Sequence, residues 1–97
     1  MTKLEVVYHN TYGKRNKINI DMDRLFPCDK DWLDRLIKIA ILGSDNPPEY
    51  LRTITEYLAK RHQEAKQIAE EKPTQKNKKT ERQYRACLDL MGGKYGQ

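Results

Sequence analysis

The side chains best suited to binding chemistry in this sequence are the basic ones of residues 72–85 (KPTQKNKKTERQYR). This stretch holds six basic residues against one acid, Glu81, so its net charge of +5 equals that of the whole 97-residue chain. A cluster of ammonium and guanidinium groups gives a salt-dependent contact with nucleic-acid phosphates that tolerates many base sequences. The stretch therefore predicts a phosphate-binding ridge, made of Lys72, Lys76, Lys78, Lys79, Arg82 and Arg85. The alternative is a solvated linker, because lysine also keeps short loops soluble.

The placement of Arg82 and Arg85 favours the ridge over the linker. Both would lie in the first turns of a helix that begins near Thr80, where a positive side chain opposes the helix dipole and adds no stability. An unfavourable placement of this kind indicates a functional reason.

A second basic cluster lies in the segment GKRNK, with Tyr12 beside it. A basic turn with a neighbouring aromatic ring can enter a groove or stack on a base, and its alternative is an ordinary exposed turn. We expect this cluster to be a second nucleic-acid contact, made of Lys14, Arg15 and Lys17. The two clusters would support each other if the fold placed them on one face.

Catalytic and metal-binding patterns are missing from the sequence. His9 and His62 fall on the polar sides of their predicted elements, so we expect both to be exposed. No protease, hydrolase or nucleotide-binding motif occurs. The spacing of the five clustered aspartates fits no EF-hand: Asp21, Asp23, Asp29, Asp31 and Asp34. Helix capping and ion pairs already explain Asp29, Asp31 and Asp34. We expect no enzymatic activity, no metal and no cofactor.

Length and hydropathy predict one small domain without a membrane span. Ninety-seven residues suffice for one modest core. No apolar run approaches the roughly 18 residues that a membrane helix needs, and residues 1–10 contain no apolar h-region, so we expect neither a membrane helix nor a signal peptide. We therefore expect a cytoplasmic protein in which Cys28 and Cys87 are small buried hydrophobes rather than a disulfide or a zinc site.

Alternating polarity predicts a β-hairpin over residues 4–22. Residues 4–9 (LEVVYH) and 17–22 (KINIDM) alternate with period two, and the turn-forming segment NTYGKRN between them supplies Gly13 for a positive φ. A lone hairpin is marginal in water, so it must pack on helices, and its outer edges could accept a further strand.

Two helices are expected next, at about residues 30–42 and 47–71. Asp29 offers an N-cap for the first, whose core stripe contains Leu33, Ile37 and Ile41 and is widened by Trp32 and Ile39. The second begins with an N-cap at Asp45 or Asn46 and proline in its first turn, and Pro73 ends it.

The apolar seam of this second helix weakens in its second half. Leu51, Ile54 and Leu58 are followed by Arg61 and Ala65. We expect the second half to project from the core, to pack on a partner or to lie over charged surface.

A last helix is predicted at about residues 80–91. Thr80 and Gln83 fit a capping box, and Tyr84, Cys87 and Met91 continue at helical spacing. The prediction leaves residues 72–79 as a basic loop and residues 92–97 as a loose tail. The fold class is then α+β, with an N-terminal antiparallel β-hairpin packed on three α-helices, the second one long.

Two functions fit these expectations. The first is a small non-catalytic module that binds nucleic acid through the basic ridge. The second is a protein-binding inhibitor or adaptor that acts on nucleic-acid-processing machinery. Anti-CRISPR and other mobile-element inhibitors share this size and non-enzymatic kind, which is an analogy of type and not a motif match. The interface of this inhibitor or adaptor would be the second half of the long helix or the hairpin edge, and a homodimer through either surface is a third hypothesis.

Overall fold

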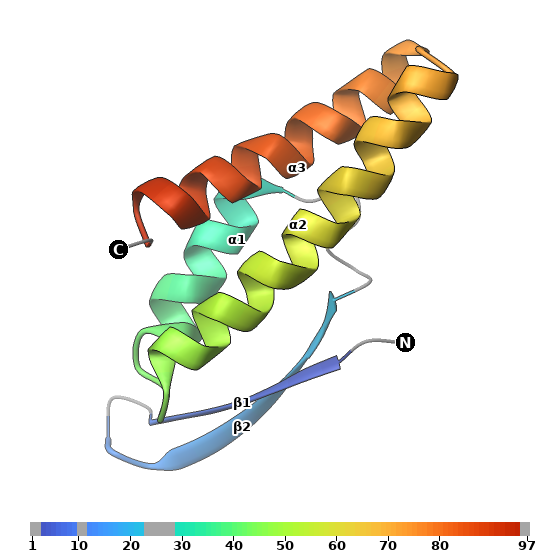
Figure 1. The fold of residues 1–97 in the computed structure, drawn as a ribbon. Helices are drawn as coiled ribbons and strands as arrows, with labels where there is room; N and C mark the ends of the chain where they lie inside the picture. The colour runs from blue at the N-terminus through green and yellow to red at the C-terminus, as the bar shows by residue number, and fades with distance from the viewer. Residues whose placement is uncertain (1–2, 10–11, 23–28, 96–97) are drawn as a thin grey trace.

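The chain folds into a β-hairpin that packs on three helices, which confirms the predicted α+β class (Figure 1). The computed structural model describes residues 3–9, 12–22 and 29–95. Its elements are β1 (Lys3–His9), β2 (Arg15–Asp21), α1 (Lys30–Leu36), the π-helical turn η2 (Ile37–Ile41), α2 (Pro47–Glu71) and α3 (Gln75–Gly93). The molecule is elongated, with principal extents of 49 × 28 × 19 Å.

The hairpin is antiparallel and its register is continuous, with Val6 opposite Ile18. Gly13 takes the positive φ of 75° that its turn requires. The second strand starts at Arg15, two residues before the predicted start, because an exposed polar side chain does not prevent a residue from pairing across the strands. Arg15 and Lys17 therefore belong to β2 and not to a loop.

The helix after the hairpin has the predicted N-cap, but its second half is a wider π-helical turn. The Asp29 carboxylate caps α1, because its Oδ1 accepts hydrogen bonds from the backbone N–H groups of Asp31 (2.9 Å) and Trp32 (3.3 Å). In η2 the Leu42 N–H donates to the Ile37 carbonyl at 2.9 Å, a five-residue spacing. The expectation that Ile39 widens the core stripe is wrong, since 69% of this residue is exposed.

The core lies where the hairpin, α1, η2, α2 and α3 meet. Its fully enclosed side chains come from every one of these elements: Val6, Leu33, Ile37, Ile41, Ile54, Leu58, Tyr84 and Cys87. Cys87 is buried as predicted, whereas Cys28 lies outside the described residues. None of the helices that the described residues form is both long and apolar enough to cross a membrane.

The largest difference from the sequence prediction is the length of α3. It begins at Gln75 instead of Thr80 and continues to Gly93, so most of the predicted basic loop is helical. The predicted loose tail is also partly wrong. Lys94 Nζ lies 3.2 Å from Asp34 Oδ1, and the Tyr95 hydroxyl donates a hydrogen bond to the same carboxylate.

The longer α3 runs antiparallel along α2 over the whole second half of the long helix (Figure 1). Ala65 of α2 is buried to 6% exposure in consequence. The second half of α2 therefore extends beyond the hairpin together with α3, on which it packs (Figure 1).

Candidate nucleic-acid interface

The predicted ridge lies at the corner between α2 and α3, where three residues connect the helices. Lys72 is the C-cap residue of α2. The Thr74 hydroxyl caps the start of α3 by accepting a hydrogen bond from the Asn77 N–H at 3.1 Å. The Asn77 side chain donates back to the Lys72 carbonyl at 2.8 Å, and the Thr74 N–H donates to the same carbonyl at 2.8 Å. The corner is thus a hydrogen-bonded turn.

The predicted capping box at Thr80 is wrong. The Thr80 hydroxyl donates to the Lys76 carbonyl one turn earlier, at 3.0 Å, as a threonine inside a helix does. Thr74, the residue that does cap α3, lacks the glutamate or glutamine that marks a capping box three residues later, because Asn77 stands there.

The helical setting orders the ridge. Helical spacing places Lys78, Arg82 and Arg85 at i, i+4 and i+7, on the side of α3 away from its buried Tyr84 and Cys87. They span about 10 Å along the axis at roughly 1.5 Å per residue. The structure brings together all six predicted ridge residues at this end, each of them exposed: Lys72, Lys76, Lys78, Lys79, Arg82 and Arg85.

The six residues differ in their acidic partners. Arg85 is held by Glu81, to which its Nε donates at 3.0 Å and its Nη2 donates a second hydrogen bond. Among the described residues, no carboxylate forms an ion pair with the other five. The centre of the ridge is therefore Lys78, Lys79 and Arg82, for which the described part of the chain provides no ion-pair partner.

Some of the charges at the corner oppose a helix dipole, whereas Lys72 at the C-cap of α2 favours it. The last turn of α2 contains Glu70 and Glu71 and no base, and the first turn of α3 contains Lys76 and no acid. Each arrangement is unfavourable for its own helix, by roughly 0.3–1 kcal/mol per charge. The dipole argument made for Arg82 and Arg85 fails, since both lie two turns or more inside α3, but it holds for Lys76.

A polar seam joins α2 to α3 beneath the ridge. His62 Nε2 lies 3.0 Å from Glu81 Oε2, so the expectation that His62 is exposed is wrong: only 22% of its side chain is accessible. Burial raises the pKa of the Glu81 carboxyl, but hydrogen bonds from Arg85 and His62 outweigh it and hold the pKa below its ordinary value. The seam thus fixes Glu81, which in turn holds Arg85 against the helix.

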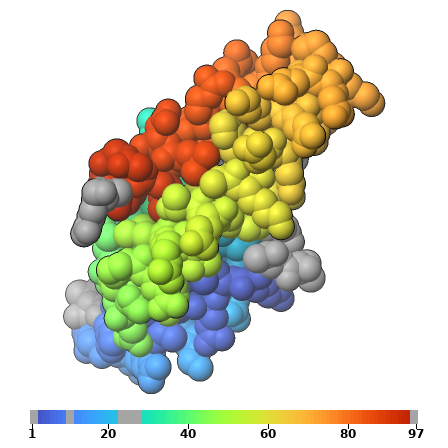
Figure 2. All heavy atoms as spheres, in the orientation of Figure 1, coloured from blue at the N-terminus to red at the C-terminus, as the bar shows by residue number. Residues whose placement is uncertain are grey.

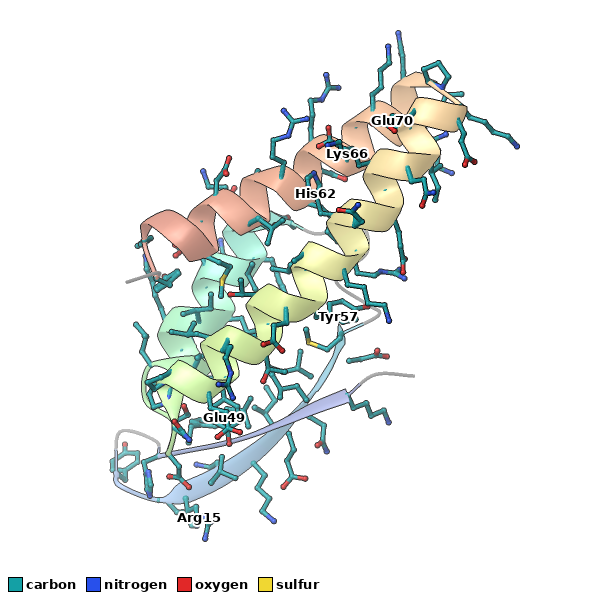
Figure 3. All side chains as sticks on the ribbon, in the orientation of Figure 1. Arg15, Glu49, Tyr57, His62, Lys66 and Glu70 are labelled. Atoms are coloured by element: carbon teal, nitrogen blue, oxygen red, sulfur yellow. The ribbon has the colours of Figure 1, made fainter. Side chains whose placement is uncertain are left out.

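Arg61, which precedes His62 in α2, also belongs to the polar seam between α2 and α3. Hydrogen bonding to Tyr84 is the main cause that raises the pKa of the Arg61 guanidinium, which also lies 3.4 Å from Glu64 and 5.9 Å from the Tyr57 ring centre. A cavity of about 300 Å³ opens beside it, lined by Arg61, Glu64, Ala65, Ile68, Lys76, Asn77 and Thr80. Figure 3 shows His62 directed from α2 toward α3.

The second predicted cluster lies at the other end of the molecule. In Figure 3, Arg15 on the hairpin and Glu70 near the corner mark opposite ends of the long axis. Arg15 lies 3.8 Å from Asp45 and Lys17 lies 3.6 Å from Glu5, so both bases have an acidic neighbour. Lys14 and Tyr12 are exposed in the turn. The two predicted clusters do not share a face.

The comparisons add no relative from which a function could be transferred. No protein-family model, no curated protein and no solved structure matches the chain. Within the described ranges, no group of three or more histidine, cysteine, aspartate or glutamate side chains could hold a metal ion.

Proposed function

We propose that this protein is a small non-catalytic module that binds nucleic acid through phosphate contacts at the α2–α3 corner. The observation that supports it is a group of exposed bases on one ordered helix, centred on Lys78, Lys79 and Arg82, with which no carboxylate of the described residues forms an ion pair. Lys72, Lys76 and Arg85 flank this centre. Such a module would act in the cytoplasm.

The type of side chain defines the type of recognition. Lysines act as point charges that meet phosphate oxygens from many directions, whereas base edges require placed arginine, asparagine or glutamine side chains. Lysines form most of the ridge, so we expect binding that varies little with base sequence and falls steeply with salt.

The hairpin cluster has a smaller part in this proposal. Arg15 and Lys17 each have an acid within 4 Å, and phosphate would have to compete with it. We expect Lys14, Arg15 and Lys17 to add little to a contact made at the corner.

The test is a titration of labelled single- and double-stranded DNA and RNA, followed by fluorescence anisotropy at low and physiological salt. The variant is Lys78→Gln/Arg82→Gln. The matched control is Arg52→Gln/Lys60→Gln, which removes the same two charge types from exposed positions of α2. We expect the first variant to lower affinity at least tenfold and to flatten the salt dependence by roughly 0.7–0.9 units of log–log slope per lost phosphate contact.

Equal weakening by both variants would reduce the effect to net charge and contradict a site at the corner. No binding by the wild type at low salt would overturn the proposal and favour the second hypothesis, in which the ridge meets an acidic patch on a protein.

A further inference from the structure

The outer edge of β2 exposes backbone hydrogen-bonding groups. On the other side of the hairpin, the Val7 carbonyl accepts from the Asp45 N–H at 3.0 Å and the His9 N–H donates to Gly43 at 3.3 Å. Odd-numbered residues of β1 therefore direct their backbone groups away from β2. In an antiparallel pair, residues opposite each other share this direction, and Val7 is opposite Lys17.

It follows that the odd-numbered residues of β2 direct their N–H and C=O groups outward: Arg15, Lys17, Asn19 and Asp21. In the part of the chain that the structure describes, β1 is the one strand that pairs with β2. The pairing register runs without a bulge over all seven residues of β2. A regular edge of this length is a template for another strand.

The order of charges along β2 makes this edge complementary to itself. In an antiparallel pair of two β2 strands centred on Ile18, Arg15 of each copy lies opposite Asp21 of the other, which adds a second acidic neighbour to the Asp45 that lies 3.8 Å from Arg15 within one chain. Lys17 then lies opposite Asn19. The hydrogen-bonding direction agrees as well, because each of these pairs joins two residues whose backbone groups point outward.

We propose that a second copy of this chain pairs along β2 in this register, forming a four-stranded antiparallel sheet around a two-fold axis at Ile18. This inference is independent of the proposed nucleic-acid contact, which lies at the far end of the molecule.

The neighbouring registers are less favourable. A two-fold axis at Lys17 places two ammonium groups directly opposite each other, which is destabilising. An axis at Asn19 places Lys17 opposite Asp21, but Arg15 then extends past the end of the partner strand. The axis at Ile18 alone uses the full strand and pairs both terminal charges.

The face of β2 that packs on the helices also fits a two-fold axis at this position. Ile18 is partly buried and packs against the core, and Ile20 is 5% exposed. Residues opposite each other in a non-hydrogen-bonded pair approach most closely, with Cα atoms about 4.5 Å apart. Ile18 meeting its own copy would therefore extend the apolar face of the sheet across the axis.

Sedimentation velocity at protein concentrations from about 10 μM to about 1 mM tests the pairing, because this range detects a dimer with a micromolar to millimolar Kd. Arg15→Asp places two acids opposite each other in the homodimer, and Asp21→Arg places two arginines opposite each other. For each variant alone we expect a dimer dissociation constant at least about tenfold higher than that of the wild type. An equimolar mixture of the two restores both opposite-charge pairs, so we expect it to form a heterodimer.

A cysteine cross-link tests the register. In a Cys28→Ser background, Ile18→Cys places two thiols on the two-fold axis, and we expect mild oxidation to yield a covalent dimer. The matched control is Asn16→Cys on the same face of β2. In this register residue 16 lies opposite Ile20 of the second copy, so the two introduced thiols are four residues apart along the strands and too far apart to join. Circular dichroism checks that each variant keeps its fold.

A wild type that remains monomeric at the highest concentration overturns the proposal. So does a mixture that fails to dimerise although the wild type does, or a cross-link that forms equally from Asn16→Cys.

Discussion

The two ends of the molecule contain basic residues in different surroundings. At the packed end, where the hairpin meets α1 and the first half of α2, Arg15 and Lys17 each lie near an acid, and the interior is apolar. At the corner end, residues 61–85, most of the bases have no ion-pair partner among the described residues, and the contact between α2 and α3 contains the half-buried Arg61, His62 and Glu81. Figure 2 shows the corner, coloured orange, standing clear of the blue hairpin. Positive charge alone therefore does not distinguish a candidate site in this molecule. What distinguishes the corner is that most of its bases form no ion pair with a described acid.

The difference in interiors predicts a difference in stability. Leu58, at the packed end, is fully buried, so Leu58→Ala should lower the free energy of unfolding by about 2–5 kcal/mol. Ile68, at the corner end, is 51% exposed, so Ile68→Ala should cost less than about 1 kcal/mol. Urea denaturation measures both. Equal losses would show that the corner contributes as much apolar packing as the packed end.

The start of α3 predicts the next largest effect. Thr74→Ala removes the N-cap and should cost about 0.5–2 kcal/mol of unfolding free energy. Thr80→Ala is the control, because the Thr80 hydroxyl bonds inside the helix and alanine is the better helix former. The reverse order of the two losses would move the start of the helix back to residue 80 and make the ridge a loop.

The polar seam at the corner predicts an acid-sensitive contribution. Because the pKa of Glu81 is lowered in the folded state, its carboxylate stabilises the protein above the ordinary pKa of 4.5, and this contribution is lost as the pH falls through the folded value. Glu81→Gln should therefore lower the free energy of unfolding near pH 7 and make that free energy fall less steeply as the pH is lowered. Urea denaturation at several pH values measures both effects.

The control for this experiment is Glu64→Gln, whose carboxylate is 49% exposed and pairs with a single arginine. A pH profile that Glu81→Gln leaves unchanged would contradict a structural role for the seam.

The smallest effect concerns a single ionisation at the far end of α3. The hydrogen bond from Tyr95, together with Lys38, lowers the pKa of Asp34 to about 2. Tyr95→Phe should raise that pKa toward 3.8, read from the pH titration of the carboxyl carbon by NMR, whereas Tyr12→Phe in the exposed turn should leave it unchanged. An unshifted Asp34 would mean that Tyr95 does not anchor the end of α3 to α1.

The parts of the fold that follow from hydrophobic periodicity could be predicted from sequence. The hairpin faces, the Asp29 cap and the buried positions Leu33, Leu58 and Cys87 each depend on a strong local pattern. Residues 75–79 carry no apolar side chain, so no periodicity marks them as helix. They are helical because the Thr74 cap and the packing of α3 along α2 stabilise them, and the second of these is a tertiary effect.

The candidate site was predicted in its residues but not in its geometry. The charge count selected all six ridge residues, among them Lys78, Lys79 and Arg82, and did not separate these three from the others. Their helical spacing depends on the true start of α3, and the neutralisation of Arg85 depends on Glu81, which His62 holds from another helix. The separation of the two basic clusters is a property of the three-dimensional arrangement, which charge patterning along the chain does not contain.

The loop that borders β1 limits how far an assembly of this chain can grow. The Asp45 and Gly43 backbone groups occupy the edge of β1 at Val7 and His9, and the Tyr50 hydroxyl accepts from the Val7 N–H at 3.4 Å. A sheet extended by pairing of β2 strands would have this protected edge on both of its outer sides. Lateral addition would then stop at two copies, so the strand that offers an edge for pairing would produce a closed pair rather than an open-ended fibre.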